Sequence, residues 1–272
     1  MAKIGTLVQD IYGLFEKGVT FNREDVKAFG VNLADKLAIR MSEERGEPAL
    51  RMSNLGTPCK RKLWYSINTP RLAEPLSAPT RIKFLFGDIL EEFLLFLARA
   101  AGHTVEREQE EIDIDGVKGH IDGTIDGELV DCKSASTYSF QKFKSHGLEG
   151  DDAFGYLTQL GGYGSKVGEG RNHFLAIDKT LGNICLDSWD KPDTDYVKEV
   201  QDARAILQSP VPPPRGYDDV ADGASGNRKL GVACSYCAFH GTCWPGLRTY
   251  AYASGPRFLT KVVREPKVDR SE

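Results

Sequence analysis

The sequence predicts an α/β protein in which a central mixed β-sheet is flanked by helices. Apolar residues recur at helical spacing in several stretches, while other short stretches alternate apolar and polar residues between Gly/Asp-rich turns. The two patterns also alternate along the chain, which is typical of the α/β class. The 272 residues suffice for one large domain with appendages, and 40% hydrophobic with 27% charged residues is ordinary globular composition.

The N-terminal stretches predict helices. Apolar spacing over residues 3–17 predicts one, and Asn22, followed by acids, predicts the N-cap of a second that runs through about Met41. We expect residues 1–50 to form a helical extension that packs on the core. Residues 80–101 are apolar on nearly all faces, so they predict a largely buried helix, with Glu92 on its exposed edge.

Strand patterns dominate the middle of the chain. A charge-rich strand pair is expected over 104–118, two strands around a turn at Gly123 to Gly127, and another pair over 173–178 and 183–189. Residues 152–167 and 194–208 predict helices. Residues 209–231 predict a Pro/Gly/Asp loop, and the tail after Pro256 is expected to be partly disordered. The predicted divisions are residues 1–50, a core over 51–208, and a C-terminal segment over 209–272.

Asp122, Asp131 and Lys133 form a candidate site. Side chains two apart on a strand share a face, so Asp131 and Lys133 point the same way, and Asp122 can join them from the neighbouring strand. Two carboxylates beside an ammonium favour a divalent-metal site that hydrolyses phosphodiesters. The formal net charge of −4 does not indicate nucleic-acid binding, so such a role would require a local basic groove. Lys60, Arg61 and Lys62 either contact phosphates or form a solvated face.

Cys234, Cys237 and Cys243 form a C-x2-C-x5-C pattern. Thiols this close together indicate a soft metal or an iron–sulfur cluster, with a fourth ligand from Cys59, Cys132, Cys185 or His240. A four-cysteine zinc site uses the same ligands, but the lack of a second C-x2-C pair favours the cluster. We expect a cytoplasmic protein, because no secretory signal or membrane-length apolar run is seen.

Five motifs occur in the order found in one known family. They are Gly87-Asp88-Ile89-Leu90-Glu91, Gly119-His120-Ile121-Asp122, Asp131-Cys132-Lys133, Gln159-Leu160-Gly161-Gly162-Tyr163, and Cys59 with the later cysteine triplet. Over residues 59–243 the chain resembles the RecB-type P-D-(D/E)-x-K exonucleases, in the branch with a 4Fe–4S cluster. That branch includes CRISPR-adaptation exonucleases, the AddB nuclease domain and phage exonucleases. Two departures are Glu91, where many relatives have His, and Asp131, where Glu is common.

The resemblance implies a restriction-endonuclease-like core and a metal-dependent DNA exonuclease of phage or prokaryotic recombination and processing. It implies Mg²⁺ or Mn²⁺ bound by Glu91, Asp122, Asp131 and the backbone carbonyl of Cys132. Lys133, Gln159 and Tyr163 would complete the catalytic set, with Tyr163 also able to stack on a base. The 4Fe–4S ligands would be Cys59, Cys234, Cys237 and Cys243.

The expected partners are single-stranded DNA or the ends of double-stranded DNA, and a recombination or replication protein; no membrane is expected. Two alternatives remain beside the exonuclease. One is a non-catalytic DNA- or partner-binding protein on a nuclease fold, and the other is zinc in place of the cluster. Electron transfer by the cluster is less favoured because the chain has no flavin motif.

Overall fold

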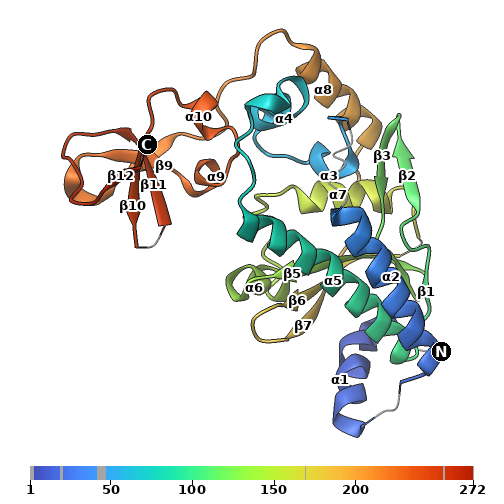
Figure 1. Ribbon diagram of the computed structural model, residues 1–272. Coiled ribbons are helices and arrows are strands. Elements are labelled where there is room, and N and C mark those ends of the chain that lie inside the picture. The colour runs from blue at the N-terminus through green and yellow to red at the C-terminus, as the bar shows by residue number, and fades with distance from the viewer. Residues whose placement is uncertain (1–2, 19–20, 42–46, 169, 254, 272) are drawn as a thin grey trace. The chain divides into compact units, whose positions relative to one another are not determined.

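The chain divides into two compact units in the computed structural model (Figure 1). The core unit comprises Met1–Gly56 and Ser77–Gln201, and the cysteine unit comprises Thr57–Leu76 and Asp202–Glu272. The structure describes residues 3–18, 21–41, 47–168, 170–253 and 255–271. This division differs from the predicted one, because the N-terminal helices belong to the core unit and the segment around Cys59 belongs with the C-terminal residues.

A five-stranded mixed sheet organises the core unit, with strand order β1-β4-β5-β6-β7. Its strands are β1 (Val105–Glu106), β4 (Gly123–Ile125), β5 (Glu128–Ala135), β6 (Asn172–Asp178) and β7 (Ile184–Trp189). Only β5 and β6 run parallel within this sheet; its other pairings are antiparallel. The predicted α/β class with a mixed sheet flanked by helices is therefore confirmed.

One face of this sheet is covered by α1 (Leu7–Lys17) and the second half of α5 (Ala78–Ala100). Their apolar side chains share one buried cluster with Val130 and Cys132 of β5. On the opposite face lie α6 (Thr137–Lys144) and α7 (Tyr156–Gly164), whose aromatic rings meet Phe174 of β6. Alternation along β5 thus directs Val130 and Cys132 to α5, and Asp131 and Lys133 to the other face.

The helix α2 (Arg23–Met41) packs on α5 without burying any of its side chains fully. The predicted cap is present, because the Asn22 side chain accepts a hydrogen bond from the Glu24 backbone at 2.9 Å. Phe29 contacts Phe93 and Phe96 of α5, with ring centroids 6.3 and 5.1 Å apart. The docking of α2 therefore depends on a few aromatic contacts and on the polar contacts described below.

Two expectations for the central helix were wrong. The first half of α5 is exposed, since Ile82, Phe84 and Phe86 are each about half accessible. Glu92 is buried at 2% exposure instead of lying on the exposed edge, and polar side chains of α2 satisfy it. The apolar pattern alone could not show which face α2 covers.

Tight Asp-Gly turns set the hairpins of this region. The predicted turn at 123–127 is shorter in the structure, because Gly123–Ile125 is strand β4 and only Asp126 and Gly127 connect it to β5. Both turn residues have positive φ, at 52° and 85°, which is the conformation that Asp-Gly favours in two-residue hairpins. The separate hairpin of β2 (Glu111–Ile114) and β3 (Val117–His120) turns at Asp115-Gly116 in the same way.

The cysteine unit has its own five-stranded antiparallel sheet, with order β12-β10-β11-β9-β8. Its strands are β8 (Asp219–Ala221), β9 (Arg228–Leu230), β10 (Arg248–Tyr252), β11 (Gly255–Lys261) and β12 (Arg270–Ser271). The expectation of a partly disordered tail was therefore wrong. Tyr250 and Leu259 are buried on this sheet, so the tail has a small core of its own.

The remaining elements are short or join these parts. They are η1 (Ile4–Thr6), α3 (Met52–Leu55), α4 (Lys60–Asn68), η2 (Pro70–Leu72), α8 (Tyr196–Gln208), η3 (Gly223–Ser225), α9 (Val232–Ser235) and α10 (His240–Cys243). The predicted strand pair of β6 and β7 and the predicted helix α8 are confirmed. Among the described residues, no helix has the length and apolar character needed to cross a membrane.

Candidate active site and cysteine site

Asp122 is joined to the β5 motif by a direct hydrogen bond. It lies immediately before β4, and its Oδ2 accepts a hydrogen bond from the backbone N–H of Cys132 at 2.6 Å. The β4–β5 hairpin positions this contact, because Gly123 pairs with Val130 in the antiparallel register. The two motifs that the sequence predicted to meet are therefore brought together.

Asp131 and Lys133 share a face of β5, as predicted. The Lys133 ammonium lies against Asp131 Oδ2 and sits 4.9 Å from the ring centroid of Tyr156 and 5.9 Å from that of Phe174. Burial by itself lowers the pKa of Lys133, but the charges of Asp131 and Asp122 outweigh it and raise that pKa above its usual value. Lys133 therefore stays protonated at neutral pH inside an aromatic-lined site.

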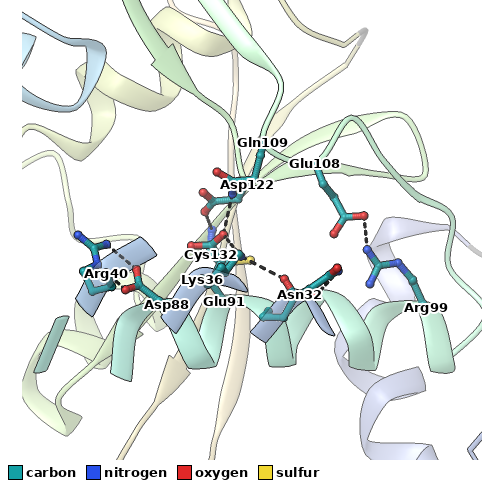
Figure 2. Close-up of polar contacts among 11 residues, drawn as sticks. Asn32, Lys36, Arg40, Asp88, Glu91, Arg99, Glu108, Gln109, Asp122 and Cys132 are labelled. Atoms are coloured by element: carbon teal, nitrogen blue, oxygen red, sulfur yellow. Dashed lines mark hydrogen bonds and ion pairs between the residues drawn. The ribbon is translucent and has the colours of Figure 1, made fainter. Parts of the chain in front are cut away.

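Glu91 reaches the same region from α5 (Figure 2). Its Oε1 accepts hydrogen bonds from Lys36 Nζ at 2.8 Å and from Gln109 Nε2 at 2.9 Å. Burial is the main cause that raises the pKa of Glu91; Lys36 opposes the rise, and the charges of Asp131 and Asp88 add to it. Glu91 on α5 and Asp131 on β5 therefore interact electrostatically.

Three carboxylates therefore form one electrostatic group. Burial raises the pKa of Asp122 well above its ordinary value, and the charges of Asp131 and Glu91 raise it further, while Lys133 and the Cys132 N–H only partly compensate. Carboxylates that destabilise one another in a desolvated place have the donor chemistry of a hard divalent cation. This residue set fits Mg²⁺ or Mn²⁺.

Each carboxylate is turned toward an internal partner in this structure. Asp122 faces the Cys132 N–H, Asp131 faces Lys133, and Glu91 faces Lys36 and Gln109. Within the described ranges, no group of three or more His, Cys, Asp or Glu side chains is arranged so that it could hold a metal ion as it stands. Metal binding at this site would require side-chain rotations.

Gln159 and Tyr163 lie on α7 behind the carboxylates. The Gln159 side chain hydrogen-bonds the Tyr163 hydroxyl, and burial chiefly raises the pKa of Tyr163, with Asp131 and Asp122 adding to the rise. Tyr163 is only 2% exposed, so stacking of its ring on a DNA base stays a prediction that would require the ring to become accessible. Gln159 and Tyr163 can therefore help to hold the side chains around Asp122 and Asp131 in place from α7.

A glycine lets Tyr163 come close to the second motif. A Cβ at Gly119 would lie 2.8 Å from Met52 Cβ and even closer to the Tyr163 hydroxyl. Only glycine leaves room for this approach. The Gly of Gly119-His120-Ile121-Asp122 is thus explained by packing against α7.

Sequence reasoning missed Lys36, Gln109 and Tyr156 as members of this region. Lys36 and Gln109 contact Glu91, which lies 55 and 18 residues away along the chain, so no local pattern joins them. The available signal was weak: Asn32, Lys36 and Arg40 recur every four residues on a helix with little apolar character. Tyr156, whose ring faces Lys133, had no signal beyond its place one turn before Gln159.

The four predicted cluster cysteines all lie in the cysteine unit. Cys59 is the N-cap residue of α4, Cys234 lies in α9, Cys237 follows α9, and Cys243 ends α10. None of the six cysteines forms a disulfide. A Cβ at Gly216 would approach Cys59 Sγ to 3.0 Å, so a close backbone passage also borders this group.

These four thiols interact electrostatically. Burial raises the pKa of Cys234, and the charges of Cys237, Cys59 and Cys243 raise it further. Burial also raises the pKa of Cys237, with Cys59 and Cys243 contributing. Cys59 therefore accompanies the triplet, whereas Cys132 and Cys185 lie on strands of the core unit. The chemistry of these four thiols suits a soft metal or an iron–sulfur cluster, although no three of them, as they stand in the described residues, are arranged to hold a metal ion.

His240, one of the candidates for the fourth ligand beside the cysteine triplet, has both ring nitrogens engaged with other groups. Its Nδ1 is 2.7 Å from the Cys237 carbonyl, which fixes that nitrogen as the donor, and its Nε2 is 3.0 Å from Glu74 Oε1. The stacked rings of Tyr65 and Phe239, 5.5 Å apart, lie in the apolar cluster that includes Cys237 and Cys243. His240 and these rings tie residues 57–76 to the triplet.

The three basic residues of α4, Lys60, Arg61 and Lys62, differ in their surroundings. Arg61 donates to the Pro213 carbonyl at 2.7 Å and to the Tyr65 hydroxyl at 3.1 Å, so its guanidinium is engaged inside the unit. A contact of Arg61 with DNA stays a prediction, and it would require the guanidinium to leave these partners. Lys62 is exposed and Lys60 is half-buried.

Comparisons with known proteins give little further guidance. No family model and no curated protein matches the chain. One solved structure, described as the crystal structure of SSO0001, is similar over 79% of this chain and 95% of the other, at 18% identity and a TM-score of 0.44.

Proposed function

We propose that this protein is a metal-dependent DNA exonuclease of the RecB-type P-D-(D/E)-x-K family, with a restriction-endonuclease-like core. The observation that carries the proposal is the hydrogen bond from the Cys132 N–H to Asp122, which joins the two acidic motifs beside Lys133. Glu91 contributes a third carboxylate to the same electrostatic group. This combination suits metal-assisted hydrolysis of a phosphodiester.

Asp122, Asp131 and Glu91, with the Cys132 carbonyl, are the residues that would hold Mg²⁺ or Mn²⁺. When bound, the ion would supply Lewis acidity at the scissile phosphate. Lys133 remains protonated beside Asp131, so its ammonium can orient the attacking water or stabilise the charge that develops on a phosphate oxygen. Gln159 and Tyr163 support this arrangement from α7, through their mutual hydrogen bond and the contact with Gly119.

The charge distribution between the units supports a DNA substrate. The cysteine unit contains 14 Lys and Arg against 8 Asp and Glu, a formal net charge of +6. The core unit contains 21 against 31, a formal net charge of −10. A mildly acidic chain thus keeps a basic part that can attract the phosphate backbone.

We further propose that Cys59, Cys234, Cys237 and Cys243 hold a 4Fe–4S cluster with a structural role. These residues come from the two separated segments of the cysteine unit, so a shared cluster would cross-link a long loop. Zinc is the alternative occupant. Visible absorption and iron-to-zinc stoichiometry of anaerobically purified protein distinguish the two.

The activity is tested with end-labelled single- and double-stranded DNA, blocked at the 5′ or the 3′ end, in Mg²⁺ or Mn²⁺. We expect degradation from unblocked ends, and its loss in Lys133→Ala. DNA binding without degradation by the unsubstituted protein would instead support the alternative, a non-catalytic DNA- or partner-binding protein on a nuclease fold. Such a protein would serve phage or prokaryotic recombination without cutting DNA itself.

A further inference from the structure

The helix α2 lays a polar stripe along the acidic stripe of α5 (Figure 2). Arg40 pairs with Asp88 through two hydrogen bonds of 2.6 Å, and Asn32 donates to Glu92 Oε1 at 3.0 Å. Lys36 lies between them along the helix. These contacts place one cation of α2 directly on Glu91, which belongs to the candidate metal site.

Lys36 bridges two neighbouring carboxylates. Its Nζ is 2.8 Å from Glu91 Oε1 and 3.1 Å from Glu92 Oε2. The side chains of Lys36 and Glu91 are 21% and 19% exposed and that of Glu92 is 2% exposed, so water screens these charges only in part. The ammonium therefore acts as a counter-ion for Glu91 at the edge of the carboxylate group.

The same carboxylate cannot serve two cations equally well. Glu91 interacts electrostatically with Asp131 and Asp122, so a divalent ion held by these residues would repel the Lys36 ammonium. Glu92 offers Lys36 a second partner outside that group. A pocket of about 280 Å³, bordered by Asn32, Lys36, Glu92 and Gln109, gives the lysine side chain room to shift.

We propose that Lys36 is a positioning residue that sets the metal affinity of the site. Without metal it holds both Glu91 and Glu92, and when a divalent ion takes Glu91 it keeps only its contact with Glu92. The aromatic contacts of Phe29 lie two turns earlier on α2, so this exchange does not require α2 to leave α5. The inference rests on the proposed metal site and adds a residue that no motif contains.

The test compares Lys36→Gln with Arg40→Gln in the full chain. Both substitutions remove ion pairing between α2 and α5, two pairs in Lys36→Gln and the Asp88 pair in Arg40→Gln, but only Lys36 touches a proposed metal ligand. Free Mn²⁺ is measured by electron paramagnetic resonance as protein is added, so the readout does not depend on activity. We expect Lys36→Gln to bind Mn²⁺ about tenfold more tightly, as removal of a nearby like charge predicts, and Arg40→Gln to bind within about twofold of the unsubstituted protein. Thermal unfolding of both variants checks that each is folded.

Asp122→Asn separates failure of this inference from failure of the proposed function. If Asp122→Asn loses Mn²⁺ binding while Lys36→Gln binds no more tightly than the unsubstituted protein, the role of Lys36 is overturned and the metal site stands. An equal gain in Arg40→Gln would also overturn it, because the effect would then come from general loosening of α2. If Asp122→Asn binds Mn²⁺ normally, the metal site and the inference both fall.

Discussion

The Asp122 carboxylate accepts a hydrogen bond from the Cys132 backbone N–H at 2.6 Å, although both lie in a region crowded with negative charge. One N–H dipole offsets only part of the repulsion from Asp131 and Glu91. The proposed metal site, with no ion bound, is therefore electrostatically unfavourable, as is common where stability is given up for function.

Asp122→Asn should stabilise the metal-free protein at neutral pH. Burial and the neighbouring carboxylates raise the pKa of Asp122 well above 3.8, so the folded protein holds this proton more tightly than the unfolded chain does. Its favourable contribution exists at low pH and is lost as the pH rises from about 4 toward the raised pKa. At pH 8 the ionised carboxylate destabilises the fold, and asparagine, which can still accept from Cys132, removes that charge.

We expect the substitution to raise the free energy of unfolding at pH 8 by on the order of 1 kcal/mol, which corresponds to about 2–4 °C in Tm. Unfolding of both proteins without added divalent metal, at pH 5 and at pH 8, measures the effect. The gain should be smaller at pH 5, where Asp122 is more protonated. An equal gain at both values would contradict the electrostatic explanation.

Gly119→Ala should disturb both packing and activity. The added Cβ would meet Met52 Cβ at 2.8 Å and crowd the Tyr163 hydroxyl. Overpacking of this kind typically lowers the free energy of unfolding by about 1–3 kcal/mol, and displacement of Tyr163 should lower the rate of DNA degradation. Urea unfolding and the end-labelled DNA assay measure the two effects.

Gly30→Ala on α2 is the matched control, since a Cβ there meets nothing within 4 Å. Alanine is the better helix former, so this variant should be more stable by about 0.5–1 kcal/mol and retain its activity. If Gly119→Ala behaved like Gly30→Ala, the close approach of Tyr163 would not matter to the site.

The part of the site that sequence reasoning could predict is the part built by local geometry. Asp131 and Lys133 share a face because strand side chains alternate, and Asp122 meets them because an Asp-Gly turn fixes the register of one hairpin. These rules act over a dozen residues. They need no knowledge of how distant helices pack.

The contacts of Glu91 and Glu92 could not be predicted in the same way. Lys36 and Asn32, which contact them, lie on α2, about 55–60 residues earlier in the chain, and the packing of α2 on α5 is set by tertiary contacts. A helical pattern shows that a helix has an apolar face but not which polar stripe will cover its acids. The prediction that Glu92 lies on the exposed edge of the helix was therefore wrong.

The C-terminal sheet was missed for a different reason. Strands β8 and β9 have three residues each, and β11 begins with Gly255 and Pro256, which ordinarily indicate a turn. β8 pairs with β9, and β9 pairs with β11, both in antiparallel orientation. These hydrogen bonds between strands stabilise segments whose own β-propensity is low. Short polar strands of this kind give no periodic signal.

Tyr163→Phe should slow catalysis without weakening DNA binding. The hydroxyl is hydrogen-bonded to Gln159 and the ring is 2% exposed, so the substitution removes a positioning contact and leaves the protein surface unchanged. We expect kcat to fall about tenfold, the scale of one lost positioning hydrogen bond, with an unchanged Kd for DNA. Single-turnover kinetics and fluorescence anisotropy separate the two quantities.

Tyr236→Phe is the control, because Tyr236 is 87% exposed and therefore lies at the surface, unlike the buried Tyr163. This variant should retain kcat. A large rise in Kd for Tyr163→Phe would instead mean that the ring becomes exposed to DNA during the reaction.

Cys59→Ser should remove the metal or cluster of the cysteine unit. Cys59 interacts with Cys234 and Cys237, and it is the single cysteine that residues 57–76 contribute to the unit. Serine is a poor ligand for soft metals, so we expect loss of the visible absorption, or of stoichiometric zinc if zinc is the occupant. Loss of a structural metal should also lower the unfolding temperature, because metal binding and folding are coupled.

Cys185→Ser is the control for this prediction. Cys185 lies on β7 of the core unit, apart from the four cysteines of the cysteine unit, and burial is the main cause that raises its pKa to about 12, so its thiol is neutral at neutral pH. Iron and zinc contents, measured on anaerobically purified protein, should match the unsubstituted chain in Cys185→Ser and fall well below it in Cys59→Ser. A full metal content in Cys59→Ser would show that the triplet recruits its fourth ligand elsewhere, and the assignment of Cys59 would have to be abandoned.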